Sequence, residues 1–232
     1  MKKTIIIPCY NEKNSINEIV SKVNKNIEDQ DEIIIVDDNS NDGTKLILNE
    51  IEKNFKNCKV FYHKKNLGKG AALRTALKEN LKDIVIIQDA DLEYDPSDYK
   101  VLMLPFIEAD ADIVYGSRFL GGSRYVRIHF FWHYLANKIL TFISNAFSNL
   151  NLTDMETGYK AFKSSVIKSV DLRENSFSIE PEITIKLAKK KFKFYEVSIS
   201  YNGRSYEEGK KITFKDAIFA LIAIIKYGVL SK

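Results

Sequence analysis

Short apolar runs alternate with stripes of helical spacing through the first half of this chain. The runs occupy residues 5–7, 33–36, 60–62, 84–87 and 113–115. The stripes consist of Ile16, Ile19, Val20, Val23 and Ile27, and of Ile47, Leu48, Ile51 and Phe55. Uniformly apolar runs of this length are typical of strands that are buried on both faces. The alternation therefore predicts an α/β fold, Rossmann-like, with a mostly parallel sheet and helices on both faces.

The composition is that of a globular protein. The chain has 232 residues, 45% of them apolar, which is enough for the core of one large domain. Its formal net charge of +4 does not indicate nucleic acid, and we expect none as a partner. Cys9 and Cys58 lack the spacing of a zinc site. We expect both to be reduced thiols in a cytoplasmic chain.

Two aspartates follow the fourth apolar run with one alanine between them. Alternate residues of a strand point to the same side, so Asp89 and Asp91 can face one point where the strand ends. Two close carboxylates repel each other, and a divalent cation relieves that repulsion. Mg²⁺ or Mn²⁺ is the expected cofactor, because such ions bind through one or two carboxylates plus substrate phosphates. Asp89 and Asp91 are the candidate metal ligands.

Other polar residues also follow the predicted strands. Tyr10, Asn11 and Glu12 come after the first run, and Asp37 and Asp38 come after the second. In open parallel sheets, ligands bind outside the carboxyl ends of the strands. All of these residues are therefore expected at one edge of the sheet, together with the aspartate pair. For Asp38 a second interpretation stays open, in which it caps the helix expected from residue 41.

Several segments in a fixed order carry a stronger signal than any single motif. They are Ile-Pro-Cys-Tyr-Asn-Glu (7–12), Val-Asp-Asp-Asn-Ser-Asn-Asp-Gly-Thr (36–44), Asn-Leu-Gly-Lys-Gly-Ala-Ala (66–72), Asp-Ala-Asp (89–91), Tyr-Gly-Ser-Arg-Phe (115–119), Thr-Asp-Met-Glu-Thr-Gly-Tyr-Lys (153–160), Glu-Pro-Glu (180–182) and Tyr-Asn-Gly-Arg-Ser-Tyr-Glu-Glu-Gly-Lys-Lys-Ile (201–212). The set resembles the family 2 glycosyltransferases of the GT-A fold. Within them it is similar to the polyprenyl-phosphate sugar transferases of the dolichyl-phosphate mannose synthase type.

The resemblance implies a nucleotide-sugar site. Its expected residues are Pro8, Tyr10, Glu12, Val36, Asp38, Lys69, Asp89, Ala90, Asp91, Glu93, Arg118, Arg204 and Lys210. Asp91, Asp154 and Arg118 are the implied catalytic residues. Arg118, Arg204, Lys210 and Lys211 are candidates for holding the two phosphates, because Arg offers a planar fork and Lys a mobile charge. The glycines at 68 and 70 either let phosphate approach the backbone or simply begin a helix.

The acceptor decides whether a general base is needed. A phosphate acceptor is already an anion near neutral pH, whereas a hydroxyl acceptor would need Asp154 or Glu156 as its base. We expect a metal-dependent, inverting transfer of a hexose from GDP-mannose or UDP-glucose to a polyprenyl phosphate. One alternative is a transferase of the same fold that acts on a saccharide hydroxyl in cell-envelope polysaccharide synthesis. Another is a non-catalytic nucleotide-sugar-binding protein.

Two segments after residue 120 indicate contact with a membrane surface. Residues 128–150 form a predicted helix with apolar side chains on opposite faces, and residues 213–230 form another with nine successive apolar residues. We expect both to lie in the interface, with a strand at 192–200 between them. No apolar run reaches the ~20 residues that cross a bilayer, and no signal peptide is expected.

We therefore divide the chain into a GT-A catalytic domain, residues 1–212, and a membrane-proximal amphipathic helix, residues 213–232. The expected location is cytoplasmic, with peripheral association to the cytoplasmic face of the membrane.

Overall fold

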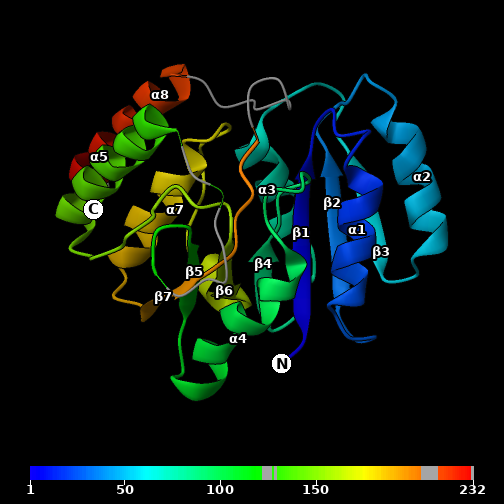
Figure 1. Cartoon of the computed structure of the whole chain (residues 1–232), viewed down its shortest axis with the longest axis horizontal. Coiled ribbons are helices and arrows are strands. Elements are labelled where there is room, and N and C mark those ends of the chain that lie inside the picture. The colour runs from blue at the N-terminus through cyan, green and yellow to red at the C-terminus, as the bar shows by residue number, and fades with distance from the viewer. Residues whose placement is uncertain (122–126, 128–129, 205–213, 231–232) are drawn as a thin grey trace.

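The computed structural model describes residues 1–121, 127, 130–204 and 214–230. Its strands form one seven-stranded sheet in the order β3-β2-β1-β4-β6-β5-β7 (Figure 1). The strands are β1 (Lys3–Cys9), β2 (Glu32–Asp37), β3 (Cys58–Tyr62), β4 (Ile84–Ile87), β5 (Ile113–Ser117), β6 (Lys160–Lys163) and β7 (Phe194–Ser198). Each of the five predicted runs lies in a strand, and the strand expected at 192–200 is β7. The mostly parallel α/β fold is confirmed.

Helices cover both faces of the sheet. They are α1 (Ile16–Lys25), α2 (Thr44–Asn54), α3 (Lys69–Leu77), α4 (Tyr99–Glu108), α5 (Phe131–Ser148), α6 (Ser164–Ile167), α7 (Ile179–Ala188) and α8 (Phe214–Ile225), with a 3₁₀ turn η1 (Pro96–Asp98) and a π turn η2 (Lys226–Leu230). Alternate residues of β1 face opposite sides: Ile5 and Ile7 pack with α1, α2 and α4, whereas Ile6 packs with α3, α7 and α8. Two separate cores therefore hold the sheet between them.

Strand β6 is the one strand of the sheet that the sequence pattern did not predict. It runs antiparallel to both of its neighbours, β4 and β5. It contains only four residues, Lys-Ala-Phe-Lys, with a lysine at each end, so it lacks the continuous apolar run of the others. Lys160 is nevertheless fully buried, because Glu180 of α7 lies 2.5 Å from its amine. Lys160 and its ion pair thus stand where the other strands have an apolar side chain, so hydrophobicity alone does not reveal this strand.

Helices α5 and α8 lie side by side at one end of the molecule, next to α7 (Figure 1). Their inner sides are buried through Leu140 and Ser144 of α5 and through Ala220, Ala223 and Ile224 of α8. Their outer sides expose large apolar side chains: Phe131, Trp132, Ile139, Phe142 and Phe147 of α5, and Ile218, Phe219, Ile222 and Ile225 of α8. We call these exposed residues the apolar surface.

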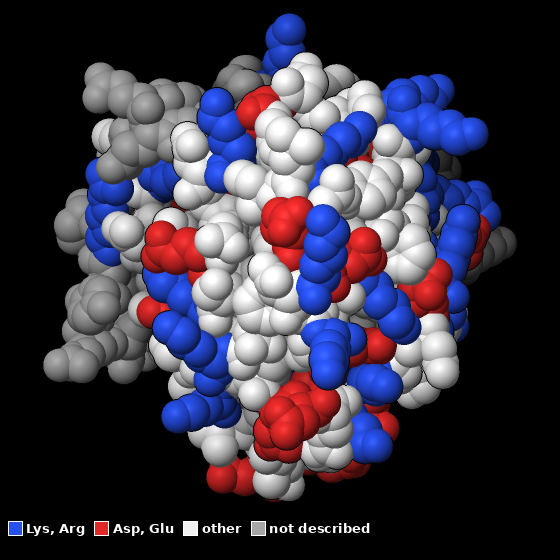
Figure 2. All heavy atoms as spheres, turned by 90° about the vertical axis from the view of Figure 1, so that its right-hand side faces the viewer, with Lys and Arg blue, Asp and Glu red and all other residues white. Residues whose placement is uncertain are grey.

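The opposite end of the molecule, over α2, has a different character. There, basic and acidic side chains are mixed across the surface (Figure 2). Pairs such as Lys53 with Glu50 on α2, 2.8 Å apart, are typical of a solvated face. Apolar side chains gather over α5 and α8 instead, as the sequence predicted. None of the helices in the described ranges is both long enough and apolar enough to cross a membrane.

Candidate active site

A cavity of about 700 Å³ opens at the carboxyl ends of the central strands. One part is polar and is lined by residues that follow β1, β2, β4 and β5, among them Tyr10, Asp38, Asp89 and Arg118. Parallel strands end at the same edge of a sheet, which is why residues so far apart in sequence meet here. The other part is largely apolar. It lies at α5 and α8 and is lined by Trp132, Ala136, Leu140, Ala217 and Ala220, together with the polar side chains of His133, Asn137 and Asp216.

Asp89 and Asp91 both line the cavity, and each has a cationic partner. The Lys69 amine lies 2.8 Å from Asp89, and an Arg204 nitrogen lies 2.7 Å from Asp91. Burial, together with the negative charges of Asp89 and Glu93, raises the pKa of the Asp91 carboxyl. Arg204 also faces Glu93 and Glu12, so carboxylates outnumber the two cations at this point.

Arg204 connects several acidic residues. Besides Asp91, it lies 3.4 Å from Glu93 and 3.6 Å from Glu12. Its backbone N–H donates to Glu93 Oε1, and the hydroxyl of Tyr201 donates to the other oxygen of Glu93, each at 2.8 Å. Glu93 thus fixes the segment that carries Arg204, and this segment brings its guanidinium into the cavity.

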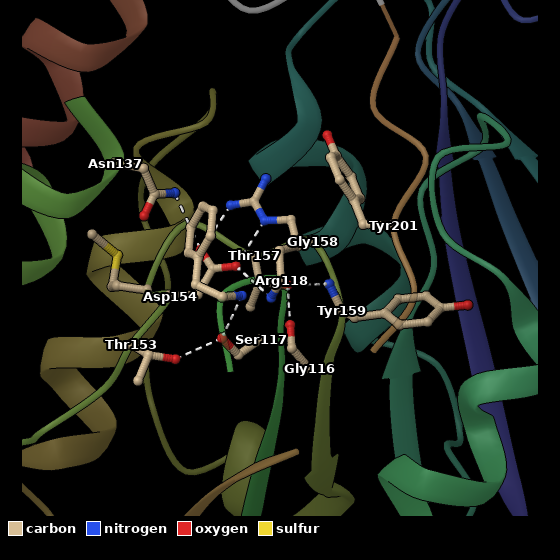
Figure 3. Close-up of polar contacts among 12 residues, drawn as sticks. Gly116, Ser117, Arg118, Asn137, Thr153, Asp154, Thr157, Gly158, Tyr159 and Tyr201 are labelled. Atoms are coloured by element: carbon tan, nitrogen blue, oxygen red, sulfur yellow. Dashed lines mark hydrogen bonds and ion pairs between the residues drawn. The ribbon is translucent and has the colours of Figure 1, made fainter. Parts of the chain in front are cut away.

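Arg118 is held by a buried aspartate. Its Nε and one terminal nitrogen donate to the two oxygens of Asp154 at 2.7 Å, and its backbone N–H donates as well. Asn137 of α5 also donates to Asp154, and the ring of Tyr201 covers the guanidinium (Figure 3). Burial alone would raise the pKa of Asp154, but the charge and hydrogen bonds of Arg118 bring it below its ordinary value. Asp154 therefore stays ionised and orients Arg118.

A network of buried charged side chains lies at the polar part of the cavity. The Lys69 amine lies 3.0 Å from Glu180, which also pairs with Lys160. Burial would lower the pKa of Lys69, but Asp89 and Glu180 raise it above its ordinary value. Lys69 is therefore charged and tied to both carboxylates. This network of ion pairs links α3, β6 and α7 to the aspartate pair.

Asp38 lines the cavity and organises the loop before α3. Its carboxylate accepts the backbone N–H groups of Leu67 and Gly68, and His63 lies 2.7 Å from it. Asp38 does not cap α2, which begins at Thr44 after a left-handed Gly43. Gly68 has a positive φ of 96°, and a side chain there would collide with the backbone oxygen of Asn175. The close approach at this glycine is thus to the protein's own backbone.

Most of the predicted nucleotide-sugar residues line the cavity. They are Pro8, Tyr10, Glu12, Asp38, Lys69, Asp89, Ala90, Asp91, Glu93, Arg118 and Arg204. Val36 and Asp154 are fully buried and do not line it. Val36 points into the core on the α3 side because it is the fifth residue of a strand with alternating faces. Lys210, together with Lys211, lies outside the described residues.

Sequence reasoning missed several cavity residues. Tyr94, Gly158 and Phe177 line the cavity, and the Tyr94 hydroxyl accepts the backbone N–H of Gly158 at 2.8 Å. A side chain at Gly158 would collide with the carboxylate of Asp89, so a larger residue there would displace Asp89. The sequence offered one signal for this segment, since Gly158 stands inside the 153–160 motif. Its position beside Asp89 depends on β6, which was not predicted.

The donor set of the aspartate pair fits a hard divalent cation. Asp89 and Asp91 offer carboxylate oxygens in a cluster with excess negative charge. Within the described part of the chain, no group of three or more His, Cys, Asp or Glu side chains is arranged to hold a metal by itself. Such an ion would therefore take its remaining ligands from substrate phosphates and water, as Mg²⁺ commonly does.

Comparisons with known proteins agree with this architecture. Residues 4–171 match the family described as glycosyl transferase family 2. The chain is 30% identical to the UDP-N-acetylglucosamine–dolichyl-phosphate N-acetylglucosaminyltransferase of Methanococcus voltae, covering 97% of this chain and 96% of that protein. It is 29% identical to the dolichol-phosphate mannosyltransferase of Pyrococcus furiosus, of which it spans 59%.

A solved structure shows the same fold at lower identity. Glucosyl-3-phosphoglycerate synthase from Mycobacterium tuberculosis, in complex with Mn²⁺, UDP and phosphoglyceric acid, superposes with a TM-score of 0.74 at 15% identity. The match covers all of this chain and 80% of that one. The same synthase has also been solved with Mg²⁺ and UDP. The family match spans well over half of the sequence, and the chain therefore belongs to glycosyl transferase family 2 and is a glycosyltransferase with the GT-A fold.

Proposed function

We propose that this enzyme is a metal-dependent, inverting glycosyltransferase that moves a hexose from a nucleotide-sugar to a polyprenyl phosphate at a membrane surface. The observation that carries the proposal is the two-part cavity. Its polar part holds carboxylates and cations that suit phosphates, and its apolar part continues to α5 and α8. A lipid phosphate has both characters in one molecule, whereas a free saccharide offers nothing to the apolar part.

The polar part would bind the donor. Asp89 and Asp91 would hold the divalent cation, which supplies positive charge that offsets the charge of the departing nucleoside diphosphate. Tyr10 and Pro8 line the same part and suit a nucleobase, since an aromatic ring offers a stacking surface. Arg204 would bind the diphosphate through its guanidinium after its ion pair with Asp91 breaks.

Arg118 would hold the phosphate of the acceptor. Asp154 binds its Nε and one terminal nitrogen, so the guanidinium is fixed in orientation while the other terminal nitrogen forms no hydrogen bond with the described residues. Arg118 lines the cavity, and the nearby apolar part lies at α5 and α8. A fixed guanidinium suits phosphate because it needs no rearrangement on binding.

The reaction needs no general base under this proposal. An oxygen of the acceptor phosphate attacks the anomeric carbon and forms a new carbon–oxygen bond. The bond from that carbon to the diphosphate oxygen breaks, and its electron pair leaves with the nucleoside diphosphate. Because attack and departure occur on opposite faces, an α-linked donor gives a β-linked product. Asp154, paired with Arg118, is then a positioning residue.

The relatives' names support a lipid phosphate acceptor and leave several donors. The Methanococcus voltae protein is named for UDP-N-acetylglucosamine and the Pyrococcus furiosus protein for mannose, both with dolichol phosphate. The apolar surface of α5 and α8 would place the cavity at the bilayer, where a polyprenyl chain is found. GDP-mannose and UDP-glucose remain the expected donors, with UDP-N-acetylglucosamine added by the first relative.

A product assay tests the proposal. The purified enzyme is incubated with Mg²⁺ or Mn²⁺, a short polyprenyl phosphate and each of the three nucleotide-sugars, and lipid products are identified by mass spectrometry. We expect a sugar-phosphate lipid that requires both the metal and Asp91. Transfer to a soluble saccharide with none to the lipid phosphate would refute the proposed acceptor.

A further inference from the structure

Glu156 stands out among the acidic residues that line the cavity. Asp89, Asp91 and Glu180 each pair with a lysine or an arginine. Oε1 of Glu180 also lacks a hydrogen bond, but it lies 3.0 Å from the Lys69 amine. Glu156 also lines the cavity, but its Oε1 is buried and has no hydrogen-bond partner among the described residues. Because Oε1 itself is shielded, a ligand in the cavity would reach this carboxyl group at its other oxygen. A buried acceptor without a partner is unfavourable, and native proteins generally retain one where a bound group compensates for it.

Glu156 lies in the part of the cavity where the sugar of the donor is expected. Two residues later, Gly158 lies so close to Asp89 that a side chain would collide with the carboxylate. Gly158 therefore lies directly beside Asp89, and Glu156, two residues earlier, lines the same cavity. A hexose attached to a diphosphate at this pair must lie next to the diphosphate, in the same part of the cavity.

The chemistry of the carboxyl group narrows the ligand further. A carboxylate accepts hydrogen bonds, so its partner must donate them. Phosphate oxygens cannot donate, and they would be repelled by the negative charge. Sugar hydroxyl groups donate, and so does the amide N–H of an N-acetylated sugar. Among the parts of a nucleotide-sugar that can lie beside Asp89, the sugar is the one that fits Glu156.

We propose that Glu156 is a specificity-determining residue that binds a hydrogen-bond donor of the transferred sugar. This inference rests on the proposed function for the identity of the donor, but it concerns donor binding alone. Burial, and next the negative charge of Glu180, raise the pKa of Glu156 from 4.5 to about 7, which agrees with a carboxyl group that lacks a cation of its own. A hydrogen bond from the sugar would stabilise its charged form.

The test compares binding of whole donors with binding of the nucleotide part. Isothermal titration at pH 8 with Mg²⁺ measures UDP-glucose, UDP-N-acetylglucosamine and GDP-mannose against UDP and GDP, without any acceptor. For the nucleotide-sugar that the wild type binds best, Glu156→Gln should weaken binding about tenfold, since the neutral amide oxygen accepts a weaker hydrogen bond than a carboxylate does. Affinity for UDP or GDP should change less than about twofold, because neither carries the sugar. Glu156→Asp should recover part of the loss.

Glu196→Gln is the matched control. Glu196 accepts the backbone N–H groups of Thr153 and Asp154, so it supports the same segment, but it does not line the cavity. We expect it to leave the difference between nucleotide-sugar and nucleotide unchanged. Equal weakening of both ligands by Glu156→Gln, as for a displaced segment, would overturn the inference.

Two further outcomes would also overturn it. Unchanged donor affinity with a lower turnover number would make Glu156 a general base. A wild type that binds UDP or GDP as tightly as any nucleotide-sugar would have no group that recognises the sugar. Failure of polyprenyl phosphate to accept the sugar would refute the proposed function and leave this binding result standing.

Discussion

Replacing Glu156 by Gln should stabilise the enzyme, and the gain should depend on pH. The pKa of this carboxyl is about 7 in the folded protein and 4.5 without the fold. Below about pH 4.5 the group holds its proton in both states and opposes folding little. As the pH rises towards about 7, the unfolded chain loses the proton more readily, so stability falls. At about 1.4 kcal/mol per pH unit, the full difference corresponds to about 3 kcal/mol above pH 7.

The amide of Gln keeps the shape of the side chain without the charge. Glu156→Gln should therefore be more stable than the wild type by about 3 kcal/mol at pH 8 and about equal to it at pH 4.5. Urea unfolding at several pH values measures this. With a slope of about 3 kcal/mol per molar urea, the midpoint at pH 8 should rise by about 1 M. Because the two proteins are compared at each pH, the contributions of the other titrating groups to the free energy of unfolding cancel.

Glu108→Gln is a suitable control, because Glu108 is exposed at the end of α4. Its midpoint should stay within about 0.2 M of the wild type at every pH, as expected of a surface substitution. A Glu156→Gln variant that is no more stable at pH 8, or equally stabilised at pH 4.5 and pH 8, would refute the account of a buried, unpartnered carboxyl. A carboxyl group that destabilises the fold in this way is expected at a position retained for ligand binding.

The remaining predictions concern the metal site, the donor and the membrane. Asp91→Asn should leave the fold intact and reduce turnover by about 10² or more, because the charge that holds the cation is lost; near-normal metal-dependent activity would remove Asp91 from the mechanism. Arg204→Ala should raise the KM for the nucleotide-sugar about tenfold, while Lys100→Ala, which removes an exposed charge on α4, should not; similar effects of both would mean that only bulk charge matters. Phe219→Glu should weaken flotation with anionic liposomes about tenfold, since Phe219 is 53% exposed on α8, whereas Leu46→Glu on α2, 73% exposed, should float like wild type; a wild type that does not float at low salt would contradict the membrane proposal.

The choice of Phe219 illustrates what the folded structure adds. The apolar pattern of 213–230 runs nearly around the helix, so the pattern alone does not distinguish Phe219 from Ile224 as a membrane-facing residue. In the structure Ile224 is fully buried against the core that includes α7. A charge at Ile224 would test the stability of the fold, whereas a charge at Phe219 tests the exposed surface.

The sequence by itself determined six of the seven strands of the sheet and most of its functional edge. Local periodicity identifies buried strands because their side chains must be apolar on both faces, and parallel strands bring their carboxyl ends together. That is enough to place Tyr10, Asp38, Asp89 and Asp91 in one cavity. Strand formation and the placement of the residues that follow each strand depend on neighbours a few positions away, so the linear sequence contains the information.

Only the tertiary structure decided which charges pair. Arg118 and Asp154 are 36 positions apart and Lys160 and Glu180 are 20 apart, and each pair is buried. A buried charge is stable only beside its partner, and the partner is set by how β5, β6 and α7 pack. The same packing leaves Glu156 on the cavity wall without a cation, because the lysine and the arginine near it are already bound to Glu180 and Asp154.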